Sequence, residues 1–191
     1  LILLISGHFR MAKVLRILNR FNIGGPTHNA TYLTKFLEPD FETKLIAGKK
    51  LSSEASSEHV LEHYNLDFEI LDDMQRSIHL FRDLKVFFKI RNIIKSFQPK
   101  IVHTHASKSG ALGRLAAMSC GVPIIIHTFH GHVFHSYFGP LKTKIYILIE
   151  RFLASKSSAI IAISDIQKKE LVDQFNIADS KKVHVIPLGF D

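Results

Sequence analysis

The sequence predicts an α/β fold in which a parallel β-sheet carries helices on both faces. Short apolar runs bounded by turn residues alternate along the chain with amphipathic stretches of helical length. Strict alternation of strand and helix is typical of parallel sheets. The chain has 191 residues, of which 46% are hydrophobic, and this is enough for one buried core. We therefore expect a single folded domain.

The expected elements follow one another along the whole chain. Strands are predicted over 13–21, 41–48, 67–73, 100–105, 123–129, 158–164 and 182–188. Helices are predicted over 26–37, about 77–97, 108–119, 140–156 and 165–174. The stretch "LSSEASSEHVLEHYN" is less regular and predicts a Ser-rich loop that leads into a short helix.

The first ten residues differ in character from the rest. They read "LILLISGHFR", without a positive n-region or a small-residue cleavage site, which disfavours a signal peptide. We expect residues 1–10 to be a leader or an expression remnant and residues 11–191 to be the domain. The single cysteine, Cys120, excludes an internal disulfide framework and favours a reducing, cytoplasmic location. The longest apolar runs fall short of the ~20 residues that a membrane helix needs.

The formal charge of +8 needs an explanation, and the segment 80–97 carries much of it. Polar residues recur on one side of the predicted helix (Arg82, Lys85, Lys89, Asn92 and Ser96), and apolar residues on the other (Phe81, Leu84, Phe87, Phe88 and Ile94). We expect the apolar side to pack on the sheet and the basic side to face solvent. The alternative is a helix that touches an anionic membrane surface. Nucleic acid is disfavoured, because basic residues are spread along the chain without a recognition motif.

A glycine pair follows the first predicted strand, in "NIGGPTHNA". In open α/β sheets, ligands bind beyond the carboxyl ends of the strands. Gly24 and Gly25 permit a tight turn and close backbone approach, and Pro26 suits the first turn of a helix. Free backbone N–H groups there could bind an anion such as a diphosphate. An ordinary strand-to-helix turn explains the pair equally well, and the absence of G-x-G-x-x-G disfavours a nicotinamide dinucleotide.

The fourth predicted strand ends in "VHTHASKSGALGRLAA". His103 and His105 should point to the same face, because strand side chains alternate. The pair could begin a metal site, but the partners of the H-x-H-x-D-H pattern are missing: Ser107 and Lys108 stand in their place. Instead, we expect Lys108 and Ser109 to meet phosphate or sugar oxygens at the start of the next helix.

Four histidines share nine positions in "HTFHGHVFH", residues 127–135. Three interpretations compete: a metal site, a catalytic site and a packed core. Zinc is disfavoured, because the segment contains no Asp, Glu or Cys. His127 lies within the predicted strand and fits the core, whereas His130, Gly131 and His132 fall in the loop that follows. There an imidazole can donate a hydrogen bond to a sugar hydroxyl or to an anionic leaving group.

Three segments together resemble a known family. They are "KIVHTHASKSGALGRLAAMSCGVPIIIHTFHGHVF", "ERFLASKSSAIIAIS" and "VHVIPLGFD", and they look like the N-terminal domain of a family 4 glycosyltransferase. The resemblance covers nearly all of 11–191 and implies a Rossmann-like sheet, one half of the two-domain GT-B fold. It implies an acceptor-side domain, with the C-terminal donor domain absent from this chain.

The resemblance also implies an activity. It is metal-independent, retaining transfer of a sugar from a nucleotide-diphosphate donor to a glycan or lipid-linked acceptor, without a cofactor, in polysaccharide or glycolipid synthesis. His130 matches the histidine that contacts the donor sugar near the reacting centre, and Gly24 and Gly25 match the glycine loop near the donor diphosphate and the acceptor. We expect His105, Gly131 and Ser164, at or beside the ends of their strands, to bind substrate with Lys108 and Ser109.

Several alternatives to this function remain. A nucleotide-sugar epimerase would share the fold, although "SKSGALGRLAA" and "HTFHGH" favour transfer. A non-catalytic module that binds an acceptor, a membrane or a partner is another alternative. Without a donor domain, the isolated chain is expected to fold but not to turn over. Its expected location is the cytoplasm, with peripheral contact at the inner face of the membrane as a further alternative.

Overall fold

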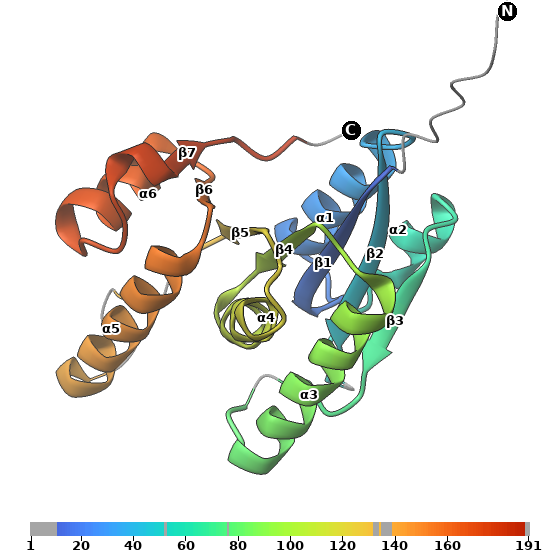
Figure 1. The fold of residues 1–191 in the computed structure, drawn as a ribbon, viewed down its shortest axis with the longest axis horizontal. Coiled ribbons are helices and arrows are strands. Elements are labelled where there is room, and N and C mark those ends of the chain that lie inside the picture. Colours follow the sequence, from blue (N-terminus) through green and yellow to red (C-terminus); the bar gives the residue numbers. More distant parts are fainter. Residues whose placement is uncertain (1–10, 52, 76, 132–133, 135–138, 190–191) are drawn as a thin grey trace, which may run out of the picture.

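The computed structural model describes residues 11–51, 53–75, 77–131, 134 and 139–189. These residues form a seven-stranded sheet in the order β3-β2-β1-β4-β5-β6-β7, and all neighbouring strands are parallel (Figure 1). The strands are β1 (Ala12–Arg20), β2 (Phe41–Gly48), β3 (Phe68–Leu71), β4 (Ile101–His105), β5 (Ile124–Phe129), β6 (Ala159–Ala162) and β7 (Val183–Val185). The predicted parallel sheet is confirmed.

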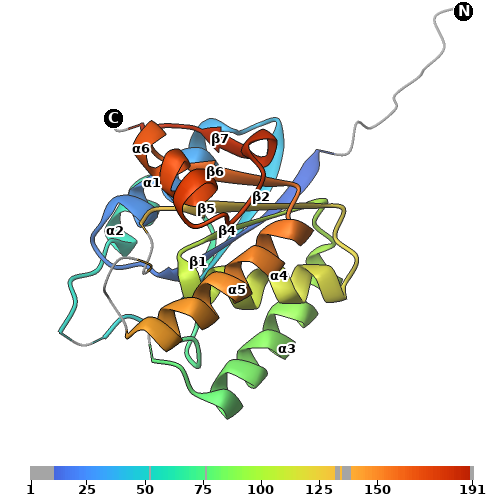
Figure 2. The same cartoon turned by 90° about the vertical axis from the view of Figure 1, so that its left-hand side faces the viewer.

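Helices cover both faces of the sheet, as predicted. They are α1 (Gly25–Phe36), α2 (Glu58–His63), α3 (Leu80–Phe97), α4 (Ser107–Ser119), α5 (Pro140–Lys156) and α6 (Asp165–Lys169). A π-helical turn, Glu170–Gln174, continues α6, and a 3-10 turn, Ser180–Lys182, precedes β7. Helices α3, α4 and α5 pack side by side on one face, and α1, α2 and α6 lie on the other (Figures 1 and 2).

Alternating side chains of the central strands supply the core of both layers. On β1, Leu15 and Ile17 point toward α3 and α4, whereas Leu18 points toward α1 and α2. All three are at most 1% exposed. Because side chains alternate along the strand, the buried Arg16, between Leu15 and Ile17, points to the α1 face of the sheet.

The last two strands are shorter than predicted. The expected strand 182–188 pairs only over Val183–Val185, and its last link to β6 is the Ile186 N–H bond to the Ala162 carbonyl. Pro187 has no N–H to continue the ladder. Residues 186–189 therefore continue along the α1 side of the sheet as irregular chain.

The packing face of α3 corrects one expectation. We expected Phe81, Leu84 and Phe88 to lie against the sheet, but they are 77%, 51% and 48% exposed. Ile94 is buried and Phe87 packs partly buried against the core, as predicted. Val86, Ile90 and Ile93 complete the buried face of the helix. Apolar residues cover more of the circumference of α3 than the sheet can contact. The sequence was therefore compatible with more than one rotation of the helix about its axis. No helix in the described part of the chain is long and apolar enough to cross a membrane.

Candidate functional site

The candidate site lies at the carboxyl edge of the sheet. Because every strand is parallel, the loops after β1, β4, β5 and β6 all leave from this edge. They place Gly24, Lys108, His130 and Ser164 on the same side of the molecule, where ligands bind in this class of sheet.

Two histidines from neighbouring strands meet at this edge. His105 is the last residue of β4, and His130 follows β5. The His105 Nδ1 atom lies 2.9 Å from His130 Nε2, and the two rings stack with centroids 5.2 Å apart. The second nitrogen of each ring, Nε2 of His105 and Nδ1 of His130, is buried without a hydrogen-bond partner among the described residues. Such an atom can accept or donate a further hydrogen bond.

Deeper on the same face, His103 belongs to a saturated chain of hydrogen bonds. Arg16 Nη1 lies 2.7 Å from His103 Nδ1, and His103 Nε2 lies 2.7 Å from Thr128 Oγ1. Because a guanidinium only donates, His103 Nδ1 accepts, and the neutral ring donates its Nε2–H to Thr128. The rings of His103 and His105 are 4.3 Å apart, which confirms that the two side chains share a face.

Arg16 is an unusual feature of this chain of contacts. Its side chain is 1% exposed, and no ion pair of the described residues involves it. Its Nε donates to Thr34 Oγ1 at 3.2 Å. Burial lowers the pKa of Arg16 to about 10, so the guanidinium stays charged at neutral pH.

His127 lies in the core, as predicted. It is fully buried on the opposite face of β5, and its Nδ1 lies 2.9 Å from Thr104 Oγ1. Gly110 of α4 lies directly over the ring, and a Cβ there would approach the imidazole Cε1 to 2.5 Å. The contact explains why a glycine occurs in the middle of α4.

The buried environment keeps these imidazoles neutral. Burial lowers the pKa of His130 to about 4. Burial first, then the charge of Arg16, holds the pKa of His103 well below its usual range. For His105, burial and then the neighbouring His103 and Arg16 act in the same direction. At neutral pH, His105 and His130, the edge pair, can therefore share a hydrogen bond but carry no charge.

The glycine loop has the expected form. Gly24 caps α1 with φ 156°, a backbone conformation that favours glycine, and Pro26 lies in the first turn. The Gly24 carbonyl accepts hydrogen bonds from the N–H groups of Thr27 and His28. A Cβ on Gly25 would lie 3.3 Å from Leu188, so this residue is close to the 186–189 segment.

Lys108 and Ser109 are more constrained than the sequence suggested. Lys108 Nζ donates to the carbonyls of Gln75 and Ser77 and pairs with Asp83 Oδ1 at 2.5 Å. The Ser109 hydroxyl is buried and donates to the His105 carbonyl one turn earlier. Both side chains hold the start of α4 in place. Their contact with substrate stays a prediction, and Lys108 would have to exchange a partner to make it.

Gly131 and Ser164 complete the predicted set. Gly131 has φ 152° and is exposed, and no described residue lies within 4 Å of where a Cβ would be. Ser164 caps α6, and its Oγ accepts from the Gln167 N–H at 3.2 Å. His132 and His135 lie outside the described residues. The substrate roles assigned to Gly131 and Ser164 stay predictions.

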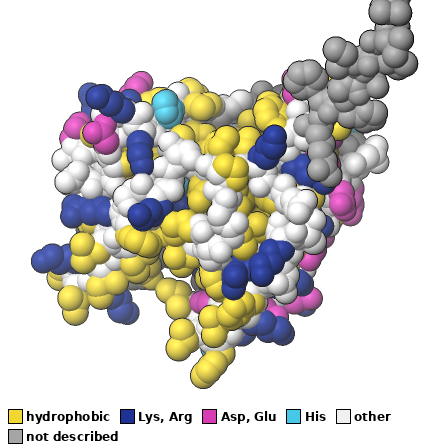
Figure 3. Space-filling view, in the orientation of Figure 1, with side chains coloured by type: hydrophobic (Ala, Val, Ile, Leu, Met, Phe, Trp, Pro, Cys, Tyr) yellow, Lys and Arg dark blue, Asp and Glu magenta, His cyan; other side chains and the backbone are white. Residues whose placement is uncertain are grey.

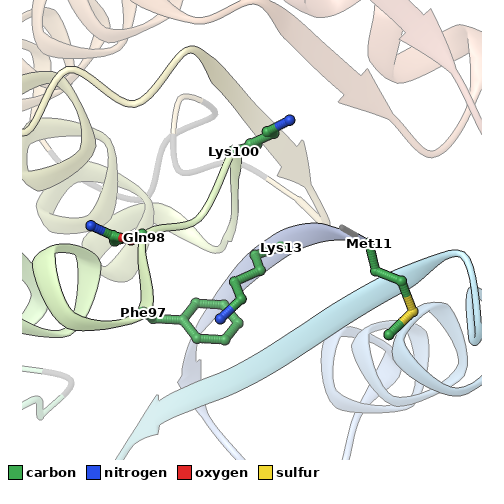
Figure 4. A pocket seen from close by; sticks show the side chains of 5 residues that line it. All are labelled: Met11, Lys13, Phe97, Gln98 and Lys100. Atoms are coloured by element: carbon green, nitrogen blue, oxygen red, sulfur yellow. The ribbon is translucent and has the colours of Figure 1, made fainter. Parts of the chain in front are cut away.

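A cavity of about 340 Å³ lies on the α1 face beside the buried chain of contacts. Apolar side chains of β1, β4, β5, β6 and α1 line most of it, and Arg16, His103 and Thr128 provide polar groups. A smaller hollow of about 90 Å³ lies at the amino ends of β1 and β4, as Figure 4 shows. Lys13 covers the Phe97 ring there, 4.8 Å from its centroid. Its position at the opposite end of the strands separates it from the candidate site.

Sequence reasoning missed Arg16 and Thr128. The signal for Arg16 was a charged residue in the middle of the apolar run "KVLRILNRF", where alternation places it on one face of the strand. Thr128 gave no such signal. No group of three His, Cys, Asp or Glu residues among those described could hold a metal ion, and the expected metal independence stays a prediction.

The sheet order, with the glycine-capped helix after β1 and the polar groups at the carboxyl edge, defines a Rossmann-like domain. The sequence profile of "Glycosyltransferase Family 4" matches residues 40–191. The chain belongs to glycosyltransferase family 4, as the sequence motifs indicated.

Two curated relatives are bacterial glycosyltransferases. The chain is 35% identical over 116 residues to the Escherichia coli UDP-Gal:alpha-D-GlcNAc-diphosphoundecaprenol alpha-1,3-galactosyltransferase, covering 61% of this chain and 30% of that protein. It is 30% identical over 129 residues to the Staphylococcus aureus capsular polysaccharide biosynthesis glycosyltransferase CapM, covering 68% and 33%. The chain spans about a third of the length of these relatives.

Solved structures support the fold. A glycosyltransferase from Rickettsia africae ESF-5 matches with a TM-score of 0.69 and 21% identity, over 94% of this chain and 43% of that chain. UDP-GlcNAc 2-epimerase from Neisseria meningitidis, bound to UDP-GlcNAc, matches with a TM-score of 0.66 and 16% identity, over 91% and 46%. The chain therefore has the fold of one half of a GT-B enzyme, and at these identities the match shows the fold alone.

Proposed function

We propose that this chain is the acceptor-side domain of a retaining glycosyltransferase that transfers a sugar from a nucleotide diphosphate to a lipid-linked acceptor in polysaccharide synthesis. The family and the two bacterial relatives support the reaction class. Residues 11–191 would form the first half of the GT-B fold, and a second domain outside this chain would bind most of the nucleotide sugar. The proposed location is the cytoplasmic side of the membrane.

The edge pair of histidines carries the mechanistic part of this proposal. If His105 donates its Nδ1–H to His130 Nε2, the neutral His130 ring bears its own proton on Nδ1. That buried N–H lacks a partner among the described residues and would donate to an oxygen of the donor sugar or of the departing diphosphate. The contact strengthens as negative charge grows on the leaving group. His130 thus positions and polarises, and His105 holds it in the required tautomer.

The glycine loop would act on the same charge. Helix α1 begins at Gly25 and is capped by Gly24, where an added Cβ would lie 3.6 Å from Pro26 Cδ. A helix N-terminus attracts anions through its free N–H groups and its dipole. Gly24 and Gly25 would therefore lie near the diphosphate or the acceptor phosphate when the two domains close.

The test is sugar transfer by the intact enzyme that contains this domain. A panel of nucleotide-diphosphate sugars would be offered with an undecaprenyl-diphosphate-linked acceptor, with and without EDTA. We expect transfer with retained anomeric configuration in both conditions, and no turnover by the 191-residue chain alone. Loss of transfer in EDTA would refute metal independence. Isomerisation of the nucleotide sugar without an acceptor would identify an epimerase instead.

A further inference from the structure

Helix α5 exposes a continuous apolar stripe. Leu141, Ile145, Leu148, Ile149 and Phe152 are between 43% and 73% exposed. Their spacing places them on one side of the helix. The buried side of α5 packs through other residues, including Leu153 and Ala154. The stripe is therefore not used by the fold of the described residues.

Helix α3 exposes a second apolar group near its start. Ile78, Leu80 and Phe81 are 70%, 76% and 77% exposed, and Leu84 and Phe88 continue the group along the helix. Phe81, Leu84 and Phe88 are three of the residues whose burial the sequence had suggested. Together, Ile78 just before α3 and four large apolar side chains in its first half exceed the singly scattered apolar residues of an ordinary surface.

The two groups project on the same side of the molecule. Helix α4 packs between α3 and α5, and the starts of the two outer helices extend beyond it in Figure 1. The space-filling view shows hydrophobic side chains at both projecting tips, with Lys and Arg side chains close by (Figure 3). Helix α5 follows β5, and α3 follows β3, so both tips lie at the carboxyl edge that holds the histidine pair.

The exposed charge of this surface is positive. On α5, Lys142 and Lys144 are exposed beside the stripe. The one acid in the sequence of α5, Glu150, is buried and pairs with Arg114 at 2.7 Å. No exposed carboxylate of α5 therefore offsets the two lysines.

Neighbouring carboxylates hold the lysines of α3 only weakly. Lys85 and Lys89 lie 2.7 and 3.9 Å from Asp73 and Glu69, in exposed pairs that contribute little. The one acid of α3, Asp83, is held by Lys108. These lysines can turn toward an external anion.

We propose that the exposed faces of α3 and α5 form a docking surface for an anionic lipid bilayer. Aromatic and aliphatic side chains would enter the interface while the flanking lysines meet lipid phosphates. The positive charge favours this occupant over a second copy of the chain, which would bring the same lysines face to face. The inference rests on the proposed function for its purpose, because docking would turn the histidine edge toward a lipid-linked acceptor.

The experiment measures binding of the purified chain to vesicles. Phosphatidylcholine vesicles would be compared with vesicles that contain about a third phosphatidylglycerol. We expect co-sedimentation with the anionic vesicles only, and a marked loss of binding in about 0.5 M salt, where exposed charges are screened. Equal binding to both kinds of vesicle, or none to either, would overturn the proposal.

Two variants and their matched controls locate the surface. Lys142→Gln with Lys144→Gln should weaken the partition coefficient about 25-fold, roughly fivefold for each lysine. The control, Lys35→Gln with Lys100→Gln, removes the same charge at the opposite edge and should bind like the parent. If the control loses binding to the same extent, the effect depends on the net charge of the chain and not on this surface, and the assigned surface is wrong.

The apolar part is tested by Phe81→Ser with Leu141→Ser. Both side chains are more than 70% exposed, so the thermal midpoint should change little while vesicle binding falls at least tenfold. Ile166→Ser, on α6 and 72% exposed, is the control and should bind normally. A dimer in sedimentation equilibrium that the double variant dissociates, without vesicle binding by the parent, would show a protein interface and refute the proposal.

These outcomes are separate from those of the proposed function, because vesicle binding needs no sugar donor. Binding without sugar transfer by the intact enzyme would refute the proposed reaction alone. Transfer by an enzyme whose domain does not bind anionic vesicles would refute the docking surface alone.

Discussion

The chain of contacts through His103 and the pair formed by His105 and His130 lie on one face of the sheet, yet they differ in one decisive respect. Both ring nitrogens of His103 have partners, from Arg16 and Thr128. The edge pair shares one hydrogen bond and leaves one nitrogen of each ring without a described partner. A saturated imidazole can only hold the structure together, whereas an unsaturated one at a ligand-binding edge can act on a substrate.

The largest expected effect separates the two regions by activity. In the intact enzyme, His130→Ala should lower the single-turnover rate roughly 100-fold to 1000-fold, about 2.7–4 kcal/mol, because a donor to developing charge is lost. The free energy of unfolding should fall by only about 1 kcal/mol, for one hydrogen bond. His127→Ala, in the core, should mainly lower the thermal midpoint. Near-normal turnover in His130→Ala would assign the edge pair to packing.

The second effect concerns stability in the buried region. His103→Ala should lower the free energy of unfolding by about 3 kcal/mol, because the buried Arg16 guanidinium loses an acceptor. Thr128→Val breaks only the neutral hydrogen bond between Thr128 and His103, and it should lower the free energy of unfolding by about 1 kcal/mol. Urea unfolding of both variants measures the difference. Equal losses would mean that the charge of Arg16 is compensated elsewhere.

Low pH should destabilise the fold through the edge pair of histidines as well as through the core. The folded pKa of His130, about 4, lies below its ordinary value of 6.5, so the unfolded chain binds protons more readily. Its contribution to stability is present above pH 6.5 and is lost as the pH falls toward 4. At pH 5 the loss should be about 2 kcal/mol. Unfolding free energies measured from pH 7.5 to 5 test this in the parent and in His130→Ala, whose slope should be shallower.

The smallest expected effect concerns the glycine loop at the edge. Gly24→Ala should lower the free energy of unfolding by about 1 kcal/mol, because φ 156° is strained for a residue with a Cβ. Space is not the cause, since the added Cβ would lie 3.6 Å from the Pro26 ring. Gly139→Ala is the control, with φ −59° and no atom of the described residues within 4 Å of the added Cβ. A similar loss in both variants would remove the conformational explanation.

Much of the fold could be predicted because its signals are local. The alternation of apolar runs and amphipathic stretches predicted seven strands and the helices between them, and the structure contains them within a few residues. A period of two placed His103 and His105 on one face, and the apolar run "PIIIHTF" placed His127 in the core. The motifs also identified the family, which the sequence profile confirms.

Tertiary structure decided what depends on distant neighbours. His105 and His130 are 25 residues apart, and their contact follows from the pairing of β4 with β5, which local periodicity does not encode. Arg16 is buried because α1 covers β1, and the exposed face of α3 depends on where α4 packs against it. The sequence by itself determined which side chains could be buried or reactive. Only the packing of whole elements decided which of them became so, because burial is set by what covers a residue from elsewhere in the chain.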